Sequence, residues 1–212
     1  MKKYITEFIG TFFLVLTVGL GDGALAIGAA LMVMIYAGGH ISGAHYNPAV
    51  TLAVFIRRRI SIGDALIYMG SQLAGAVVAA LVVSIFVKLP DQADQSSLVI
   101  SKALLAEFIG TFALAYVVLN VATAKANEGN SYFGLAIGFT VFAMASSLGR
   151  HSGGAFNPAV AVGAIVMNAF EVSKIWIYLL GCFGGAAIAG LVFNALNPEE
   201  KLPITGPQDK IA

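Results

Sequence analysis

A stretch of nine residues occurs twice in this sequence, and its residue types are those that start a helix in apolar surroundings. The first copy is Ser-Gly-Ala-His-Tyr-Asn-Pro-Ala-Val at 42–50, and the second is Ser-Gly-Gly-Ala-Phe-Asn-Pro-Ala-Val at 152–160. Asparagine is a preferred helix N-cap, and proline is tolerated at the first helical position because the N–H that it lacks would have no partner there. We therefore predict that one helix begins after Asn47 and another after Asn157.

Two helix starts of this kind can select solutes by charge. The unpaired N–H groups and the macrodipole place about half a positive charge at each helix N-terminus. If the side-chain oxygens of Asn47 and Asn157 cap their own helices, both amide NH2 groups are left to donate outward. Such donors hold a neutral solute by its oxygen and repel a cation or a hydrated proton. The residues assigned to this site are Asn47, Pro48, Ala49, Asn157, Pro158 and Ala159.

Apolar runs divide the chain into six predicted membrane spans and two shorter helices. Crossing the hydrocarbon core takes about 20 residues. Runs of that length lie near residues 4–21, 24–42, 63–88, 101–123, 132–150 and 174–195. The runs after the two asparagines, 48–56 and 158 to about 169, each reach about half of the bilayer. We predict that these half-helices enter from opposite sides and together make a seventh crossing.

The order of these elements repeats once along the chain. Glu-Phe-Ile-Gly-Thr-Phe at 7–12 reappears at 107–112, which indicates an internal duplication. Three spans per half is an odd number, so the second half is inverted, and broken helices in such repeats place their site near the midplane. The predicted fold class is an all-α polytopic membrane protein with six transmembrane helices and two re-entrant half-helices. The predicted organisation is one domain over 1–197, with repeats over 3–88 and 101–196, and a mobile cytoplasmic tail over 198–212.

The composition is that of an integral membrane protein. Of the 212 residues 58% are hydrophobic and 11% are charged, and the mean hydropathy is +0.87, whereas soluble domains carry about 25% charged residues. A net charge of +1 leaves no basic surface for nucleic acid. The first 20 residues have some features of a signal peptide, but Glu7 interrupts them and the motif returns later, so we favour an uncleaved span. The single cysteine, Cys182, can form no intrachain disulfide.

The basic residues predict an orientation, because cytoplasmic loops carry an excess of lysine and arginine. If the N-terminus is cytoplasmic, the inside residues are Lys2, Lys3, Arg57, Arg58, Arg59, Lys125, Lys201 and Lys210, and the outside residues are Lys88, Lys102, Arg150 and Lys174. We therefore expect both termini to be cytoplasmic and the protein to lie in the cell membrane, inner or plasma.

The doubled Asn-Pro-Ala, the His-Ile-Ser-Gly lead-in at 40–43 and the Glu-Phe-Ile-Gly-Thr-Phe openings resemble the aquaporin, or major intrinsic protein, family, as far as about Asn197. The resemblance implies the aquaporin fold, a pore in each subunit, a homotetramer, and passive passage of water or small uncharged solutes through the lipid bilayer without a cofactor. It also implies that Glu7 and Glu107 brace the re-entrant loops by accepting backbone hydrogen bonds. The alternative for these carboxylates is a proton relay, although relays usually chain several ionisable groups.

The sequence departs from the family pattern at the outer constriction. Most members have Arg directly after the second Asn-Pro-Ala, where this chain has Val160. An ungapped count from the two asparagines assigns the other constriction positions to Ile27, Ala145 and Gly154. This set is small and apolar, so we expect a wider and less polar selectivity filter than in strict water channels. Glycerol-conducting members usually have Asp where this chain has Ala161, which weakens a glycerol-specific interpretation without excluding it.

Four further polar residues lie near the predicted pore. Arg150 and His151 precede the second motif, and His40 and His45 precede or lie in the first. All four are candidate donors in a pore vestibule. A solvated loop charge is the favoured alternative for Arg150 and His151. For His40 and His45, packing within the loop explains their presence about as well as a vestibule role does. The histidines lack the spacing and the partners of a zinc or iron site, so no metal is predicted.

These features favour a passive channel for water and small neutral solutes, with glycerol, urea, ammonia and metalloid acids among the candidates, and with ions excluded at the paired motifs. The alternative is an ion-coupled secondary transporter, because inverted repeats and broken helices also occur in transporters. Ion coupling normally uses intramembrane acids, and only Glu7 and Glu107 lie deep in the predicted spans. A membrane enzyme is less favoured still, since the sequence offers no nucleophile with a base and no metal group.

Overall fold

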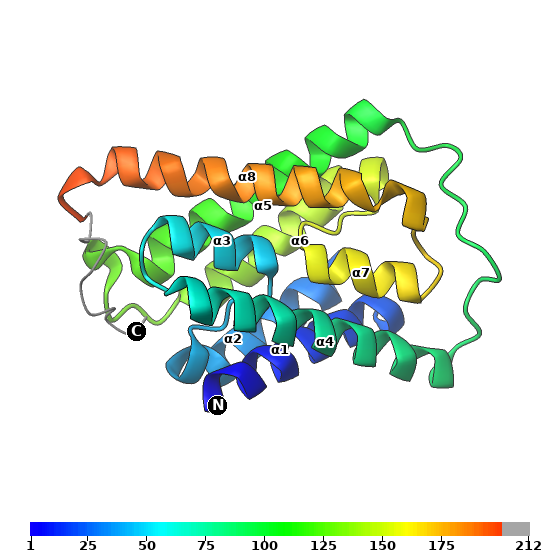
Figure 1. Ribbon diagram of the computed structural model, residues 1–212, viewed down its shortest axis with the longest axis horizontal. Helices are drawn as coiled ribbons and strands as arrows, with labels where there is room; N and C mark the ends of the chain where they lie inside the picture. Colours follow the sequence, from blue (N-terminus) through cyan, green and yellow to red (C-terminus); the bar gives the residue numbers. More distant parts are fainter. Residues whose placement is uncertain (201–212) are drawn as a thin grey trace.

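The computed structural model describes residues 1–200 as eight α-helices and three short 3₁₀-helices (Figure 1). Six helices are long and apolar enough to cross a membrane. They are α1 (Lys2–Leu20), α2 (Ala24–Ser42), α4 (Ile62–Phe86), α5 (Ile100–Thr123), α6 (Phe133–Ser152) and α8 (Ile175–Leu196). The predicted spans agree with these helices to within two residues at every end. The chain is an all-α integral membrane protein.

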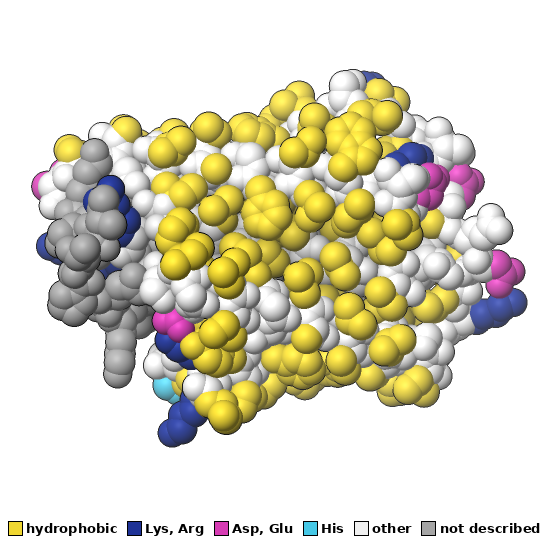
Figure 2. Space-filling view, in the orientation of Figure 1, with side chains coloured by type: hydrophobic (Ala, Val, Ile, Leu, Met, Phe, Trp, Pro, Cys, Tyr) yellow, Lys and Arg dark blue, Asp and Glu magenta, His cyan; other side chains and the backbone are white. Residues whose placement is uncertain are grey.

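Charged side chains gather at the two ends of the bundle and leave an apolar belt between them on the face shown in Figure 2. Large side chains stay exposed along this belt, including Leu66 on α4 and Leu191 on α8, at 61% and 57% exposure. A surface of this kind suits hydrocarbon, where helices satisfy their backbone groups internally. We call the end that holds Lys2 and the start of α4 the proximal end, and the opposite end the distal end.

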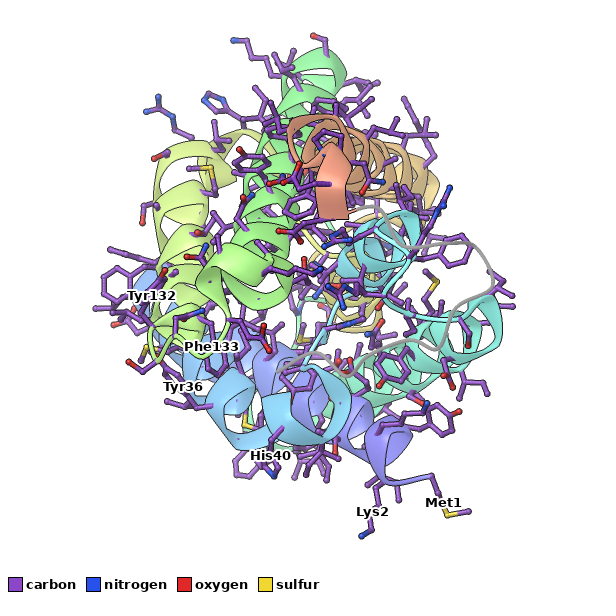
Figure 3. The ribbon with its side chains drawn as sticks, turned by 90° about the vertical axis from the view of Figure 1, so that its left-hand side faces the viewer. Met1, Lys2, Tyr36, His40, Tyr132 and Phe133 are labelled. Atoms are coloured by element: carbon purple, nitrogen blue, oxygen red, sulfur yellow. The ribbon has the colours of Figure 1, made fainter. Side chains whose placement is uncertain are left out.

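The two repeats pack against each other through α2 and α6. A Cβ on Gly28 would lie 2.5 Å from the Gly138 carbonyl oxygen, and the reverse also holds, so the helices can approach this closely only through glycine. Nearer the proximal end, the rings of Tyr36 and Phe133 meet edge to face, 5.2 Å apart (Figure 3). The Tyr36 hydroxyl also accepts a hydrogen bond from the Leu135 N–H at 3.0 Å.

Two half-helices, α3 (Pro48–Ile56) and α7 (Pro158–Val166), have nine residues each and enter the bundle from opposite ends (Figure 1). Each packs against the third span of the other repeat, α3 on α8 and α7 on α4. The repeats are therefore interlocked around the point where the two half-helices meet. The half-helices and their opposite entry are as the sequence predicts, although α7 ends before the predicted residue 169.

A 3₁₀-helix, Pro198–Glu200, docks on the proximal end. Arg57, at the end of α3, donates to the Glu200 carbonyl at 2.8 Å and to its carboxylate at 2.5 Å, and the second carboxylate oxygen accepts the Lys125 N–H at 3.0 Å. Arg57 and Glu200 are 1% and 7% exposed. These contacts hold residues 198–200 of the predicted tail against the bundle, where the Glu200 carboxylate supplies the counter-charge that a buried guanidinium needs. The rest of that tail, 201–212, lies outside the described residues.

Candidate functional site

Asn47 and Asn157 cap the two half-helices. The backbone of each is extended, with φ of −157° and −159°. Each side-chain oxygen accepts a hydrogen bond from the N–H two residues further on, at 2.8 Å from Ala49 and 2.9 Å from Ala159. The intervening prolines suit the first helical position because they have no N–H to satisfy. Both asparagines are 3% exposed, so the two helix starts lie in the interior of the bundle.

The two caps are joined to each other. The Asn47 side-chain nitrogen donates to the Phe156 carbonyl at 2.9 Å, and the Asn157 side-chain nitrogen donates to the Tyr46 carbonyl at 2.9 Å. The sequence predicts two free NH2 groups, and the structure corrects this, because each group donates one hydrogen bond to the opposite loop. An amide nitrogen carries two hydrogens. One N–H of each asparagine therefore remains for a solute.

A buried carboxylate holds the loop in front of α3. Glu7, on α1, accepts hydrogen bonds from the Ser42 hydroxyl at 2.6 Å and the His45 N–H at 3.0 Å. Its second oxygen accepts the Tyr46 N–H at 2.7 Å and the Gln72 side-chain amide at 2.8 Å. All four partners are donors, so one side chain supplies an acceptor to each of four buried polar groups.

The second repeat holds the loop in front of α7 in the same manner. Glu107, on α5, accepts hydrogen bonds from the Ser152 hydroxyl at 2.6 Å, the Ala155 N–H at 3.0 Å and the Phe156 N–H at 2.6 Å. Its fourth partner is the Cys182 thiol, with the sulfur 3.4 Å away. Both carboxylates are fully buried. Each therefore positions a helix start without reaching solvent.

The residues before the two asparagines have a strained backbone. Tyr46 and Phe156 both have φ of 48°, a left-handed conformation that bulky residues rarely adopt and that costs about 1–3 kcal/mol. The N–H of each is bound by a glutamate and the carbonyl of each by the opposite asparagine. These hydrogen bonds fix the orientation of the peptide groups on both sides of Tyr46 and of Phe156. The geometry of the site is thereby maintained.

A cavity of about 360 Å³ runs past the paired asparagines toward the distal end. The four residues predicted to form the selectivity filter all lie on its wall: Ile27, Ala145, Gly154 and Val160. Most of the other lining side chains are apolar as well. Among residues 1–200, the polar side chains on the wall are His45, Tyr46, Asn47, Lys88 and Asn157.

The loops before α3 and α7 contribute residues to this wall and have carbonyl groups without a protein donor. Residues 44–46 and 153–156 line the cavity, and Gly43 directly precedes the first of these stretches. Within the described chain, six of their carbonyl oxygens accept no hydrogen bond from the protein. They belong to Gly43, Ala44, His45, Gly153, Gly154 and Ala155. Acceptors on the loops and donors on the asparagines are therefore available to a small polar molecule.

The histidines predicted for the vestibule have other surroundings. His40 is exposed at the periphery of the proximal end and does not line the cavity (Figure 3). His45 does line it but is 4% exposed, and its Nδ1 is hydrogen-bonded to the Thr51 hydroxyl at 3.0 Å. The Thr51 hydroxyl also donates to the Asn47 carbonyl at 3.1 Å and accepts from the Gln72 side-chain amide at 3.0 Å, which ties His45 to the start of α3. His45 thus braces the loop through Nδ1, while its Nε2 has no partner within the described residues.

Arg150 and His151, the other predicted vestibule residues, are also absent from the cavity wall. They lie in the last turn of α6 and line a neighbouring, more polar hollow of about 330 Å³. Residues of the segment 94–99 line the same hollow. No group of three His, Cys, Asp or Glu residues within 1–200 could hold a metal ion.

Sequence reasoning did not identify the partners on the third span of each repeat. Tyr68 donates to the Ser42 carbonyl at 2.8 Å, and Tyr178 donates to the equivalent carbonyl at 2.6 Å. Gln72 and Cys182 complete the two carboxylate sites. The 110-residue offset between the two asparagines also relates Tyr68 to Tyr178 and Gln72 to Cys182. Extending the repeat alignment through these spans would have revealed both pairs.

Known proteins share this arrangement. The family model described as Major intrinsic protein matches residues 1–193. Glycerol uptake facilitator protein-like 6 of Lactiplantibacillus plantarum is 37% identical, over 94% of this chain and 100% of its own length. Putative aquaporin NIP4-1 of Arabidopsis thaliana is 34% identical, over 94% of this chain and 76% of its own. The fold is similar to that of the aquaglyceroporin from Plasmodium falciparum, with a TM-score of 0.78 at 21% identity, over 95% of this chain and 99% of that one. The chain therefore belongs to the major intrinsic protein family, and it is a membrane channel rather than an enzyme.

Proposed function

We propose that this channel passively conducts water and small uncharged solutes such as glycerol, and that it excludes ions where α3 and α7 meet. The observation that carries the proposal is the joined pair of helix N-termini at Asn47 and Asn157, on the wall of a largely apolar cavity. Each N-terminus contributes about half a positive charge. No carboxylate from the described residues lies on the cavity wall to offset it.

Neutral solutes can pass because the site offers both donors and acceptors. The oxygen of water or of an alcohol accepts the remaining N–H of Asn47 and Asn157, while its hydrogens reach the carbonyls of residues 43–45 and 153–155. Hydrogen bonds to water are thus exchanged for hydrogen bonds to protein, which costs little net free energy. A cation gains the carbonyls but must also pass two positive helix ends, so it is repelled.

An ion-coupled transporter has less support. Glu7 and Glu107 are the deep carboxylates, and each accepts hydrogen bonds from four donors. Neither lies on the cavity wall. Coupling to an ion would need a carboxylate that the ion can reach, and the surroundings of these two leave no such access.

The distal part of the cavity suits solutes larger than water. The wall there carries Ile27, Ala145, Gly154 and Val160, none of which is polar. The name of the relative from L. plantarum, a glycerol uptake facilitator, agrees with this. Ala161 is fully buried and does not line the cavity, so the missing Asp at that position does not bear directly on passage.

Stopped-flow light scattering on proteoliposomes tests the proposal. We expect water and glycerol permeabilities above those of protein-free liposomes, without dependence on an ion gradient. A Val160→Trp variant is the matched control, because an indole on the wall would fill the cavity and lower both fluxes while leaving the asparagine cap in place. Wild-type permeability at the protein-free level for water and every small neutral solute would overturn the proposal.

Ion exclusion is tested in the same liposomes with a pH-sensitive dye inside. We expect no proton flux through the wild-type channel. Asn157→Asp keeps the capping oxygen but replaces the NH2 that binds the Tyr46 carbonyl with a negatively charged oxygen. A proton or cation leak should therefore appear in this variant. If the leak does not differ between wild type and variant, the barrier does not depend on the asparagines.

We further propose that the proximal end is cytoplasmic and that the chain forms a homotetramer in the cell membrane, as the charge distribution and the family resemblance imply. Cys182 is fully buried, so single added cysteines report orientation. In intact cells an impermeant maleimide should label Lys102→Cys but not Lys125→Cys, and the reverse pattern would invert the assignment. Native mass spectrometry should show four chains.

A further inference from the structure

The segment 87–99 joins α4 to α5 (Figure 1), and we call it the distal segment. Its first residues form part of the cavity wall. Val87, Lys88, Leu89 and Pro90 all line the cavity. Within residues 1–200, Lys88 is the only charged side chain on that wall, and it takes part in none of the ion pairs between described residues. The distal mouth of the cavity thus carries the positive charge of the exposed Lys88, with Asp91 three residues further along the chain.

The distal segment is tied to the loop that follows α7. The Asn168 side-chain amide donates to the Pro90 carbonyl at 3.0 Å. Gln95 and Glu171 form a reciprocal pair, in which the Gln95 N–H donates to the Glu171 carboxylate at 3.0 Å and the Glu171 N–H donates to the Gln95 side-chain oxygen at 2.8 Å. Lys88 therefore lies between the end of α4 and two anchored positions.

Gln95 is the buried anchor of this segment. It is 8% exposed, and its side-chain nitrogen donates to the Tyr178 hydroxyl at 2.7 Å. The Tyr178 hydroxyl in turn donates to the Ser152 carbonyl, at the start of the loop before α7. Both ends of the Gln95 amide are therefore bound, as expected for a buried polar group, and the distal segment is coupled to the pore loop of the second repeat.

We propose that Lys88, positioned by Gln95, is a specificity-determining residue of the pore. Its ammonium group supplies at the distal mouth the fixed positive charge and hydrogen-bond donor that Val160 does not. It disfavours cations before they reach the paired asparagines and binds solutes that present an oxygen. This inference rests on the proposed function, because a mouth can select solutes only if they pass through the cavity.

Thiol labelling tests whether Lys88 lines the mouth. Since Cys182 is fully buried, Lys88→Cys adds a single accessible thiol, and the purified variant is labelled in detergent with a bulky maleimide before reconstitution. We expect labelling to abolish most of the glycerol and water flux. Lys102→Cys is the matched control, because Lys102 lines the neighbouring hollow instead, and its flux should survive equal labelling.

The placement of Lys88 and the proposed channel function are overturned by different results. A labelled Lys88→Cys channel that conducts as well as the unlabelled one, or a thiol that cannot be labelled, would overturn the placement of Lys88. A wild-type protein without any flux would overturn the proposed function instead.

A pair of isosteric molecules tests the role of the charge. Urea is neutral and guanidinium is a cation of the same shape, so guanidinium that enters the mouth should block urea flux. In Lys88→Glu the half-blocking concentration should fall by about tenfold, because two units of charge change at the mouth. Lys88→Arg should behave as wild type. An equal effect of Lys102→Glu would mean that only the general surface potential matters and would overturn the assignment to Lys88.

Gln95→Leu tests the positioning role. The substitution removes the acceptor for the Glu171 N–H and the donor to Tyr178. We expect guanidinium block to strengthen toward that of a neutral Lys88→Gln variant, which should lie between wild type and Lys88→Glu, while water flux is kept, because Lys88 loses its fixed place but the asparagine site does not. A purely structural role would lower all fluxes together, and that outcome, or an unchanged guanidinium block, would overturn the role of Gln95.

Discussion

Replacing Glu7 with glutamine should destabilise the protein, because the carboxylate is surrounded by donors. Glutamine keeps one oxygen for the Ser42 hydroxyl and the His45 N–H but turns an NH2 group toward the Tyr46 N–H and the Gln72 amide. Gln72 can rotate its amide and present its oxygen, which has no partner within the described residues, although its nitrogen then gives up the Thr51 hydroxyl as well. The Tyr46 N–H belongs to a strained loop and is left without an acceptor.

The cost follows from these contacts. An orphaned buried N–H costs about 1–3 kcal/mol, and a hydrogen bond loses about 1 kcal/mol when its acceptor becomes neutral. One orphan and two weakened bonds amount to about 4 kcal/mol. At about 2–4 °C per kcal/mol for a chain of this size, the thermal midpoint should fall by roughly 8–16 °C. Glu107→Gln should cost less, because the Cys182 sulfur can accept from the new NH2 group.

Thermal unfolding in detergent, followed by circular dichroism, measures this difference. Glu128→Gln is the control for the loss of one negative charge, because Glu128 is exposed and should leave the midpoint unchanged. The order of midpoints should be wild type and Glu128→Gln, then Glu107→Gln, then Glu7→Gln. If Glu7→Gln unfolds at the temperature of the control, the carboxylate does not hold the loop and the reasoning is refuted.

Three further predictions concern the ends of the pore and of the chain. Val160→Arg should lower glycerol and urea permeability more than water permeability in stopped-flow, and an unchanged ratio would show that position 160 does not line the constriction. Glu200→Gln should lower the free energy of unfolding by about 3 kcal/mol, because it leaves Arg57 buried without a counter-charge. In the double variant with Arg57→Met part of this loss should be recovered in thermal unfolding, whereas additive losses would contradict the pairing. The pKa of Glu171 lies below its ordinary value of 4.5, chiefly because the Gln95 N–H binds its carboxylate. A lowered pKa means that this carboxylate stabilises the fold at neutral pH and that the stabilisation is lost only as the pH falls below about 4.5 and through the lowered value. Cleavage of the distal segment by pepsin should therefore accelerate with falling pH more in wild type than in Glu171→Gln, and parallel pH profiles would rule out this titration.

The half-helices could be predicted from the sequence because the chemistry of a helix start is local. An asparagine followed by proline supplies the cap and tolerates the first helical position whatever the rest of the chain does. Both half-helices accordingly begin at Pro48 and Pro158, as predicted. Opposite entry followed from counting spans between two copies of one motif, which needs no knowledge of side-chain contacts.

The anchors at the two ends of the bundle could not be predicted, because no local pattern marks them. Gln95 contacts Glu171 across 76 residues, and Arg57 contacts Glu200 across 143. Gln95 and Arg57 are each a single polar residue, and nothing in the neighbouring sequence distinguishes them from the other polar residues between the spans. Lys88 is marked in the sequence only as a charge between two spans, and its place on the cavity wall depends on those long-range contacts.

The centre of the pore is nearly symmetric, whereas its two mouths are not. Tyr46 and Phe156 share the same φ of 48°, and the two asparagine cross-bonds have the same length of 2.9 Å. A symmetric centre presents the same donors and the same positive potential to a solute from either side, so it can reject charge but cannot distinguish the two directions of approach. Discrimination by side must then come from the mouths, because Lys88 lines the cavity at the distal end and, among residues 1–200, no charged side chain of the proximal end lines it. Guanidinium added on one side only should therefore affect urea flux differently from guanidinium added on the other.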